Sequence, residues 1–252
     1  MTWDWQVFCK NTSEDVIEAS CWAGGGDQTY LQWMLHAWGW TLAVAGCAWV
    51  VSMVVGSVIG VLRTLPNSPG VVRAANAWVE MFRNVPILVQ LFIWYFVVPK
   101  AFPVFQQVPG FLLVVFALGF FTSARIAEQV RAGIQAMPRG QRYAGMAMGF
   151  TTFQTYRYVL LPMALRIILP PLTSESMNLL KNSSVAFAVS IAELTMFAMQ
   201  AQEETSRGIE VYLAVTALYA LSAFAVNRIF AFIEKKVAIP GFIVAGGTGG
   251  GH

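Results

Sequence analysis

Long apolar stretches that contain no acidic or basic side chain dominate the chain. The three clearest are Leu31–Leu62, Ala101–Ala124 and Val211–Asn227. A helix must present about 20 mostly apolar residues to cross the hydrocarbon core of a bilayer. Each of these stretches therefore predicts a membrane-spanning helix.

Two further stretches are weaker. Asn84–Pro99 is short, but its helix can begin earlier, near Ala74. That start requires Glu80 and Arg83 to pair at i,i+3 near the cytoplasmic surface. The region 164–202 holds two apolar segments that three charged residues interrupt: Glu175, Lys181 and Glu193.

The distribution of basic residues decides how many crossings are counted. If the acidic N-terminus lies outside, the outer segments hold three Lys or Arg residues (Lys10, Lys100, Arg207) and the inner segments hold ten. This excess on the inner side is what membrane insertion favours, and it arises only if region 164–202 crosses an odd number of times. We therefore predict an all-α, polytopic membrane protein with about five transmembrane helices, its N-terminus out and its C-terminus in. Val185–Gln200 is the candidate for a re-entrant or partly buried element, although which half of the region makes the full crossing stays open.

Composition agrees with this class and argues against others. Hydrophobic residues make up 57% of the chain and charged residues 12%, against about 25% charged in an average soluble protein. This argues against a cytosolic enzyme, and against a nucleic-acid binder despite the net charge of +3. His36 and His252 are too far apart for a zinc-protease motif, and no metal site is expected. Cys9 and Cys21 can pair if the N-terminal arm is periplasmic, or remain two separate thiols.

The longest polar segment between the spans is the loop from Arg131 to Arg166, which holds five arginines and no acid. Pro138 fits the first turn of a short helix, and Gly149 fits the left-handed position that ends it. Thr151 and Gln154 form a capping box that starts a second helix. Pro162 then marks a boundary before the next span, or lies in the first turn of that span. By this chemistry alone, the loop can also be a basic linker that lies on anionic lipid headgroups.

The spacing of several motifs decides between these interpretations. Gly140-Gln141, Ala144-Gly145, Gly149 and Leu161-Pro162 closely resemble the "EAA" loop of ABC importer permeases. The segments PRGQ, LPPLTSE and LLKNSS resemble the polar amino acid uptake subfamily, and GQRYAGMAMG with TYRYVLLPMALR looks most like the glutamate/aspartate importer permeases. The resemblance covers about residues 31–239. It implies the type I importer permease fold, with cytoplasmic coupling helices that dock on a separate ATPase.

The resemblance also assigns roles and partners. The residues that it implies for ATPase coupling are Gly140, Tyr143, Ala144, Gly145, Gly149 and Pro162. Tyr143 stands where the family has the glutamate that names the loop, so the docking contact differs here. The implied partners are a pair of ATPase subunits carrying ATP and Mg²⁺, a second and related but distinct permease, a periplasmic amino acid-binding protein and the lipid bilayer. No nucleic acid partner is expected.

The chain is thus expected to divide into a periplasmic arm (1–30), a transmembrane domain (31–239) with its coupling loop at 138–162, and a flexible cytoplasmic tail (240–252). It has no G-x-x-x-x-G-K-[ST] phosphate loop, so it is expected to bind no cofactor and to hydrolyse no ATP by that route. The implied function is import of a polar amino acid, such as glutamate or aspartate, across the bacterial inner membrane. The alternative is a channel or an ion-driven amino acid carrier that needs no ATPase.

Ionisable residues inside a membrane helix are costly and are candidates for a transport path. Glu175, Asn178 and Lys181 recur at i, i+3 and i+6, and three small polar residues follow them: Asn182, Ser183 and Ser184. One interpretation is a polar lining in which Lys181 meets a substrate carboxylate. The other is an internal ion pair between Glu175 and Lys181 that fixes the helix.

A second charged group lies near the inner end of the third predicted span. Arg125, Glu128 and Arg131 are spaced at i,i+3, which predicts a local structural ladder.

Overall fold

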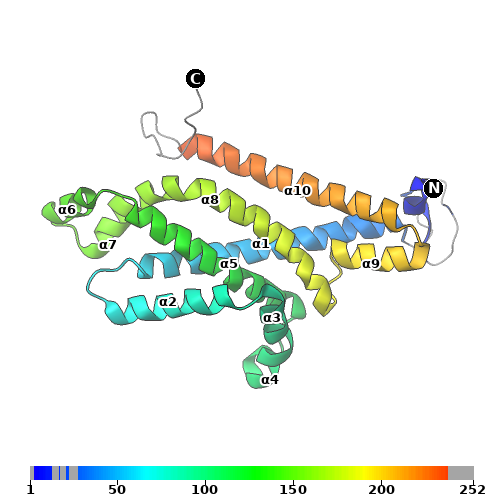
Figure 1. Ribbon diagram of the computed structural model, residues 1–252, viewed down its shortest axis with the longest axis horizontal. Coiled ribbons are helices and arrows are strands. Elements are labelled where there is room, and N and C mark those ends of the chain that lie inside the picture. Colours follow the sequence, from blue (N-terminus) through cyan, green and yellow to red (C-terminus); the bar gives the residue numbers. More distant parts are fainter. Residues whose placement is uncertain (1–2, 13–16, 18–20, 23–27, 238–252) are drawn as a thin grey trace.

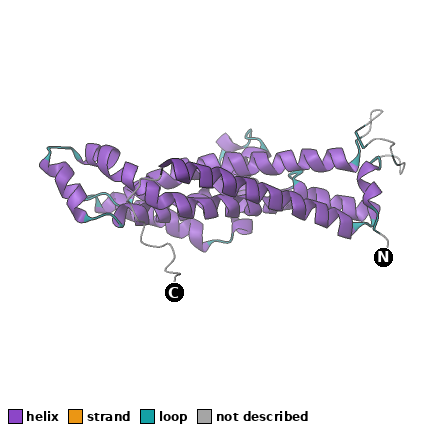
Figure 2. Ribbon diagram, turned by 90° about the horizontal axis from the view of Figure 1, so that it is seen from above, coloured by secondary structure: helices purple, strands orange, loops and turns teal. Residues whose placement is uncertain are grey.

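A computed structural model gives the structure of the chain for residues 3–12, 17, 21–22 and 28–237. The predicted tail 240–252 lies outside the described residues. Helices make up the regular structure of the described part, and most of them run along one long axis (Figures 1 and 2). The all-α fold class is therefore confirmed.

Three long helices match the three clearest apolar stretches of the sequence. They are α1 (Tyr30–Leu62), α5 (Gly110–Gln135) and α10 (Gly208–Val237), and each is long and apolar enough to cross a membrane. A capping box of Thr29 and Gln32 begins α1, which satisfies backbone N–H groups that the first helical turn leaves unpaired. The hydrophobic pattern thus predicts these three helices, although α5 begins nine residues after the predicted start at Ala101 and runs eleven residues past the predicted end at Ala124.

The second predicted span is broken. Helix α2 (Pro69–Asn84) is followed by α3 (Ile87–Phe92), a π-helical turn η2 (Ile93–Val97) and α4 (Val98–Ala101), and the chain bends by 105° between α2 and the helices after it. A short 3-10 turn, η3 (Pro103–Phe105), leads on to α5.

The break falls at Val85-Pro86. Pro86 drives the residue before it out of the helical region, and Val85 has φ −95° and ψ 129°. The Gln90 side chain donates to the carbonyls of Phe82 and Val85, both at 2.8 Å, and so stabilises the broken end. The expectation of one continuous helix from Ala74 was wrong because this proline outweighs the apolar pattern.

Region 164–202 forms one bent span. Helix α7 (Thr152–Thr155), the π-helical turn η4 (Tyr156–Leu160), α8 (Leu161–Asn182) and the 3-10 turn η5 (Ser183–Val189) follow one another without a break, and α9 (Leu194–Thr205) continues at 53° to them. A re-entrant hairpin would need to reverse direction, whereas α9 continues toward the end where α10 begins (Figure 1). The expected re-entrant element at Val185–Gln200 is therefore a bent continuation of the span.

With each bent pair taken as one span, the described residues contain up to five, as the sequence predicts. The N-terminal segment and the last turn of α10 lie toward opposite ends of the molecule, and α6 and α7 form the end away from the N-terminus (Figure 1). An odd number of crossings requires this arrangement.

The central helices pack closely because small residues face large ones. Gly60 of α1 lies against Val130 of α5, where a Cβ added to the glycine would come within 2.6 Å of the valine Cβ. Gly56 lies against Ile126 in the same way. Small residues let helix backbones approach closely inside a membrane, where no hydrophobic effect drives them together.

The N-terminal segment is fastened to the end of the bundle. Its 3-10 turn η1 (Trp5–Cys9) buries Val7 and Phe8 against α1, α9 and α10. Cys9 and Cys21 form a disulfide, which answers the question that the sequence left open. The Asp4 carboxylate lies 3.3 Å from the Arg207 guanidinium and adds an ion pair at the same place.

Candidate coupling loop and translocation path

The predicted coupling loop projects from one end of the molecule as two short helices. Helix α6 (Arg139–Ala147) begins directly after Pro138, and Gly149 follows it with φ +81°, in the left-handed region. Thr151 then caps α7: its hydroxyl accepts from the Gln154 N–H, and the Gln154 side chain accepts from the Thr151 N–H. The helix, glycine and helix order predicted from local residues is therefore the order in the structure.

Pro162 lies in the first turn of α8, so the second of its two predicted positions is the one found. No helix boundary separates α7 from α8, because η4 connects them. Proline has no backbone N–H to donate, and its ring needs space near the carbonyl four residues earlier. A π-helical turn before Pro162 provides that space. The loop after Gly149 and the long helix α8 are thus one connected element.

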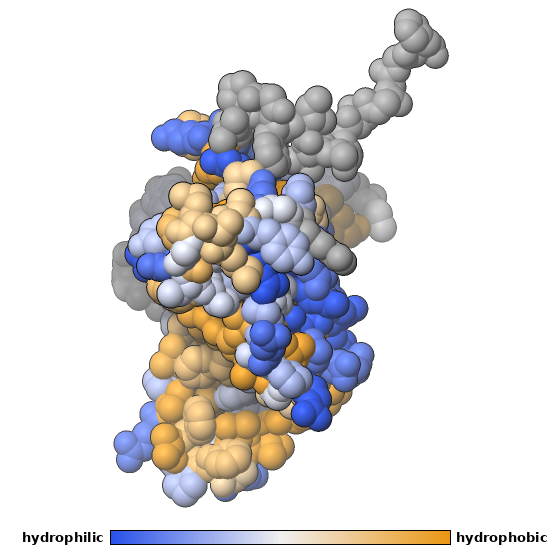
Figure 3. All heavy atoms as spheres, turned by 90° about the vertical axis from the view of Figure 1, so that its left-hand side faces the viewer, coloured by the Kyte–Doolittle hydropathy of each residue, from blue (hydrophilic) through white to orange (hydrophobic). Residues whose placement is uncertain are grey.

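Several large side chains on this loop are exposed. Tyr143 is 63% exposed, and Met146, Met148 and Phe153 are also exposed. Gly145 faces inward instead, where an added Cβ would lie 3.2 Å from the Thr155 side chain, so it lets α6 pack against α7. Figure 3 views the molecule from this end and shows polar surface beside apolar surface. Such exposed apolar groups are typical of an interaction site.

The loop is anchored to the connection between α1 and α2. The Tyr156 hydroxyl donates to the Thr64 carbonyl at 2.6 Å, and its Oη lies 3.1 Å from the Thr64 Oγ1. A cavity of about 350 Å³ lies beside this contact, with Pro138 and Arg142 among its lining residues. The loop is therefore linked to α1 as well as to α5 and α8.

The polar residues of α8 do not all share one environment. Lys181 is exposed, while Asn178 and Asn182 are half-buried. Ser183 is buried, and its hydroxyl donates to the Leu180 carbonyl within the helix at 2.7 Å. Ser184 donates to the carbonyl of Lys181 at 2.7 Å.

The predicted ion pair between Glu175 and Lys181 is not formed. Six residues advance an α-helix by about 9 Å and turn it by about 240°, which places the two side chains on different sides. Glu175 is paired with Arg125 of α5 instead, with 3.9 Å between Oε2 and Nη1. Among the residues that the structure describes, no acid lies within ion-pairing distance of Lys181.

The predicted ladder on α5 is a junction between helices. Glu128 lies 2.8 Å from Arg63 at the end of α1, 3.2 Å from Arg83 of α2 and 3.7 Å from Arg131. Arg125 points away from this group to Glu175. The expected pair of Arg83 with Glu80 is replaced by the contact with Glu128. The contact of Arg63 with Glu128 could not be predicted from spacing, because the two residues lie 65 positions apart.

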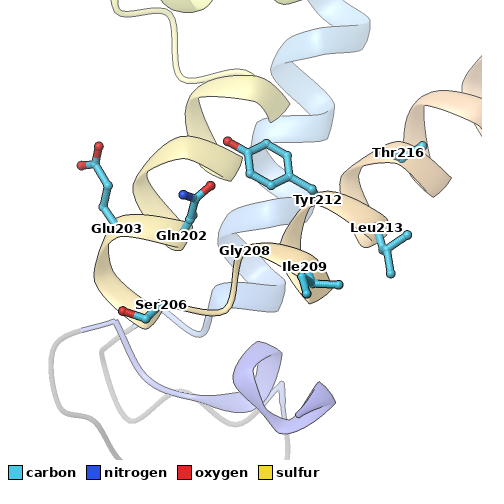
Figure 4. Close-up of a pocket in the computed structure, with 8 residues that line it drawn as sticks. All are labelled: Gln202, Glu203, Ser206, Gly208, Ile209, Tyr212, Leu213 and Thr216. Carbon is cyan, nitrogen blue, oxygen red and sulfur yellow. The ribbon is translucent and has the colours of Figure 1, made fainter. Parts of the chain in front are cut away.

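The opposite end of the molecule carries a separate hollow. It has a volume of about 790 Å³ and lies at the turn from α9 to α10, lined by residues that include Gln202, Glu203 and Tyr212 (Figure 4). The N-terminal segment lies close to the same turn (Figure 4). None of the residues predicted for coupling or for the path is part of this hollow.

Bent membrane-spanning helices, a projecting two-helix loop and exposed charge within the spans together define a membrane subunit of the type I ABC importer class. The comparisons with known proteins agree. The family described as "Binding-protein-dependent transport system inner membrane component" matches residues 52–239, and the chain belongs to this family.

Two curated relatives resemble the chain over much of its length. The "Glutamate/aspartate import permease protein GltJ" of Escherichia coli (strain K12) is 39% identical over 249 residues, which cover 95% of this chain and 96% of that protein. The "Probable glutamine ABC transporter permease protein GlnM" of Bacillus subtilis (strain 168) is 34% identical over 197 residues, 78% of this chain and 89% of that protein.

Solved structures show the same fold. The "Crystal structure of an amino acid ABC transporter with histidines" matches with a TM-score of 0.71 and 30% identity, over 82% of this chain and 95% of that one. A methionine ABC transporter, MetNI, matches at 23% identity with a TM-score of 0.71 and supports the fold alone. The chain is therefore a permease subunit of an amino acid ABC importer, and ATP is hydrolysed by a separate subunit.

Proposed function

We propose that this permease imports acidic amino acids, glutamate and aspartate, across the bacterial inner membrane. The observation that carries the proposal is the 39% identity with a glutamate/aspartate import permease over nearly the whole of both chains. The identity with a glutamine permease is lower and covers less of the chain. An exposed lysine within a membrane helix adds chemical support, because a substrate carboxylate would be its natural partner.

The proposed path follows the polar side of α8. Lys181 would receive a substrate carboxylate, and the half-buried amides of Asn178 and Asn182 would offer hydrogen bonds near it. Glu175 lies one to two turns further toward the coupling loop and holds Arg125. Ser183 is buried and would contribute packing only, whereas Ser184 is half-buried beside Lys181, and each hydroxyl already donates to a carbonyl within the helix.

The proposed coupling runs through the loop 138–162. Tyr143 and its exposed neighbours on α6 would dock on the ATPase, with Gly140 and Ala144 leaving room for a close approach. Gly149 would set the angle between α6 and α7. Since α7 and α8 are connected through Pro162 without a boundary, a displacement of the loop by the ATPase would move α8 and its polar residues as one body.

The proposed partners follow from this scheme. A pair of ATPase subunits would bind ATP and Mg²⁺, while this chain would bind no cofactor. A second permease, related to this chain but distinct from it, would complete the pathway. A periplasmic binding protein would deliver the amino acid at the end where the N-terminal segment lies.

The test is reconstitution of the complete complex in proteoliposomes. We expect ATP hydrolysis to rise when the binding protein carries glutamate or aspartate, and labelled glutamate to accumulate only with ATP on the ATPase side. Stimulation by glutamine but by neither acidic amino acid would overturn the proposal. The chain reconstituted alone is the control, and uptake by it would indicate a channel or a carrier.

A further inference from the structure

Arg125 is a charged side chain in the inner half of a membrane-spanning helix, three residues before Glu128. It lies 15 residues after the first residue of α5 and 10 before the last, and its side chain is 45% exposed. A charge at this depth is costly in lipid, and such residues normally face a water-filled cavity or another protein group. The exposed side of Arg125 therefore faces the pathway or the second permease.

The counter-ion of Arg125 satisfies it only in part. Nη1 lies 3.9 Å from Glu175 Oε2, which is too long for a hydrogen bond. The same Oε2 is buried and has no hydrogen-bond partner among the described residues. By contrast, the guanidinium of Arg63 lies 2.8 Å from Glu128 and donates to Asn76 at 2.7 Å. Arg125 thus keeps donors available for another anion.

Arg125 and Lys181 lie at successive depths of the same region. Helices α5 and α8 run in opposite directions, and Arg125 is level with Glu175. Lys181 lies six residues beyond Glu175, about 9 Å further along α8 and away from the coupling loop. An anion moving along α8 toward the loop would meet Lys181 first and Arg125 next.

We propose that Arg125 is a second carboxylate-binding residue of the path, and that Glu175 is its resident counter-ion, which a substrate carboxylate displaces. The inference rests on the proposed import of acidic amino acids. Lys181 binds the carboxylate at the outer level and Arg125 binds it at the inner level. The guanidinium suits the second task, because it offers five donors in a planar fork that matches a carboxylate.

A purely structural ion pair makes a different prediction. If Arg125 and Glu175 only joined α5 to α8, removing either charge would have the same effect, since each would leave the other unpaired. If Glu175 competes with the substrate for Arg125, the two substitutions have opposite effects on substrate binding.

The test measures binding of radiolabelled glutamate to the membrane complex of both permeases and the ATPase subunits in nanodiscs. The binding protein is left out so that it does not bind the glutamate. We expect Arg125→Gln to weaken binding about ten- to a hundredfold, the effect of losing a hydrogen bond to a charged group. Arg125→Lys retains the charge and should keep most of the affinity. Glu175→Gln should tighten binding.

Arg228→Gln is the matched control. Arg228 lies over the Phe224 ring at 4.7 Å, as Arg125 lies over the Phe121 ring at 5.1 Å, but it lies on α10 and not on α5 or α8. Binding by Arg125→Gln equal to that of this control would overturn the inference, as would weaker binding by Glu175→Gln. Import of glutamate by the wild-type complex is measured separately. If the wild type imports no acidic amino acid, the proposed function fails, whereas the variants test only the role of Arg125.

Discussion

Gly149 offers a perturbation whose size follows from the structure. Its φ of +81° lies in the left-handed region, and a Cβ added there would meet no atom within 4 Å. Gly149→Ala therefore introduces no clash, and its cost is the conformational one alone, about 1–2 kcal/mol. At about 1.4 kcal/mol for each factor of ten, the angle between α6 and α7 that we assign to docking would become about five- to thirtyfold less populated.

We expect this loss to appear as uncoupling. In proteoliposomes with the complete complex, Gly149→Ala should lower the number of amino acids imported per ATP hydrolysed, and stimulation of ATP hydrolysis by the loaded binding protein should fall. The thermal stability of the purified complex should change little, because α6 and α7 lie at the end of the bundle (Figure 1).

Two variants separate backbone conformation from bulk. Gly149→Asn adds a larger side chain, but asparagine tolerates the left-handed region better than alanine does, so it should retain more coupling than Gly149→Ala. Gly149→Val should lose the most, since a β-branched residue is least compatible with positive φ. A loss of coupling that follows side-chain volume, with asparagine worse than alanine, would rule out a conformational role for Gly149, as would wild-type transport by all three variants.

Three further predictions concern other contacts. Tyr156→Phe removes the hydrogen bond to the Thr64 carbonyl, worth about 1 kcal/mol, and should speed hydrogen exchange of the α6 amides about fivefold; unchanged exchange would show that this bond does not anchor the loop. Gly60→Ala places a Cβ 2.6 Å from that of Val130 and should destabilise the purified complex by about 1–3 kcal/mol, whereas Gly70→Ala, with open space around its Cβ, should leave its melting temperature unchanged. Cys9→Ser removes the disulfide and should lower the free energy of unfolding by about 3 kcal/mol. Reductant should then destabilise the wild-type complex but not the variant, and equal destabilisation of the two would contradict the disulfide's role.

Local chemistry explains what the sequence predicts well. Gly149 and the Thr151 capping box depend only on residues within a few positions, and the spans of α1, α5 and α10 depend on continuous hydropathy. The break at Val85-Pro86 also had a local signal, the proline, but the apolar pattern on both sides concealed it.

Contacts between distant helices explain what the sequence did not predict. Spacing along α8 suggested that Glu175 and Lys181 pair, whereas packing of α5 against α8 gives Glu175 to Arg125. Arg63 reaches Glu128 only because the end of α1 packs beside α5. Such pairs depend on how the helices are arranged, which spacing within one helix does not contain.

The function that we propose is ATP-driven import of an acidic amino acid, with the ATP hydrolysed on a partner subunit. The most direct measurement is uptake of labelled glutamate into proteoliposomes that contain the complete complex, with the loaded binding protein on one side and ATP on the ATPase side. We expect accumulation that requires both the binding protein and ATP hydrolysis. Accumulation without ATP, or ATP-driven uptake of glutamine with no uptake of glutamate or aspartate, would contradict it.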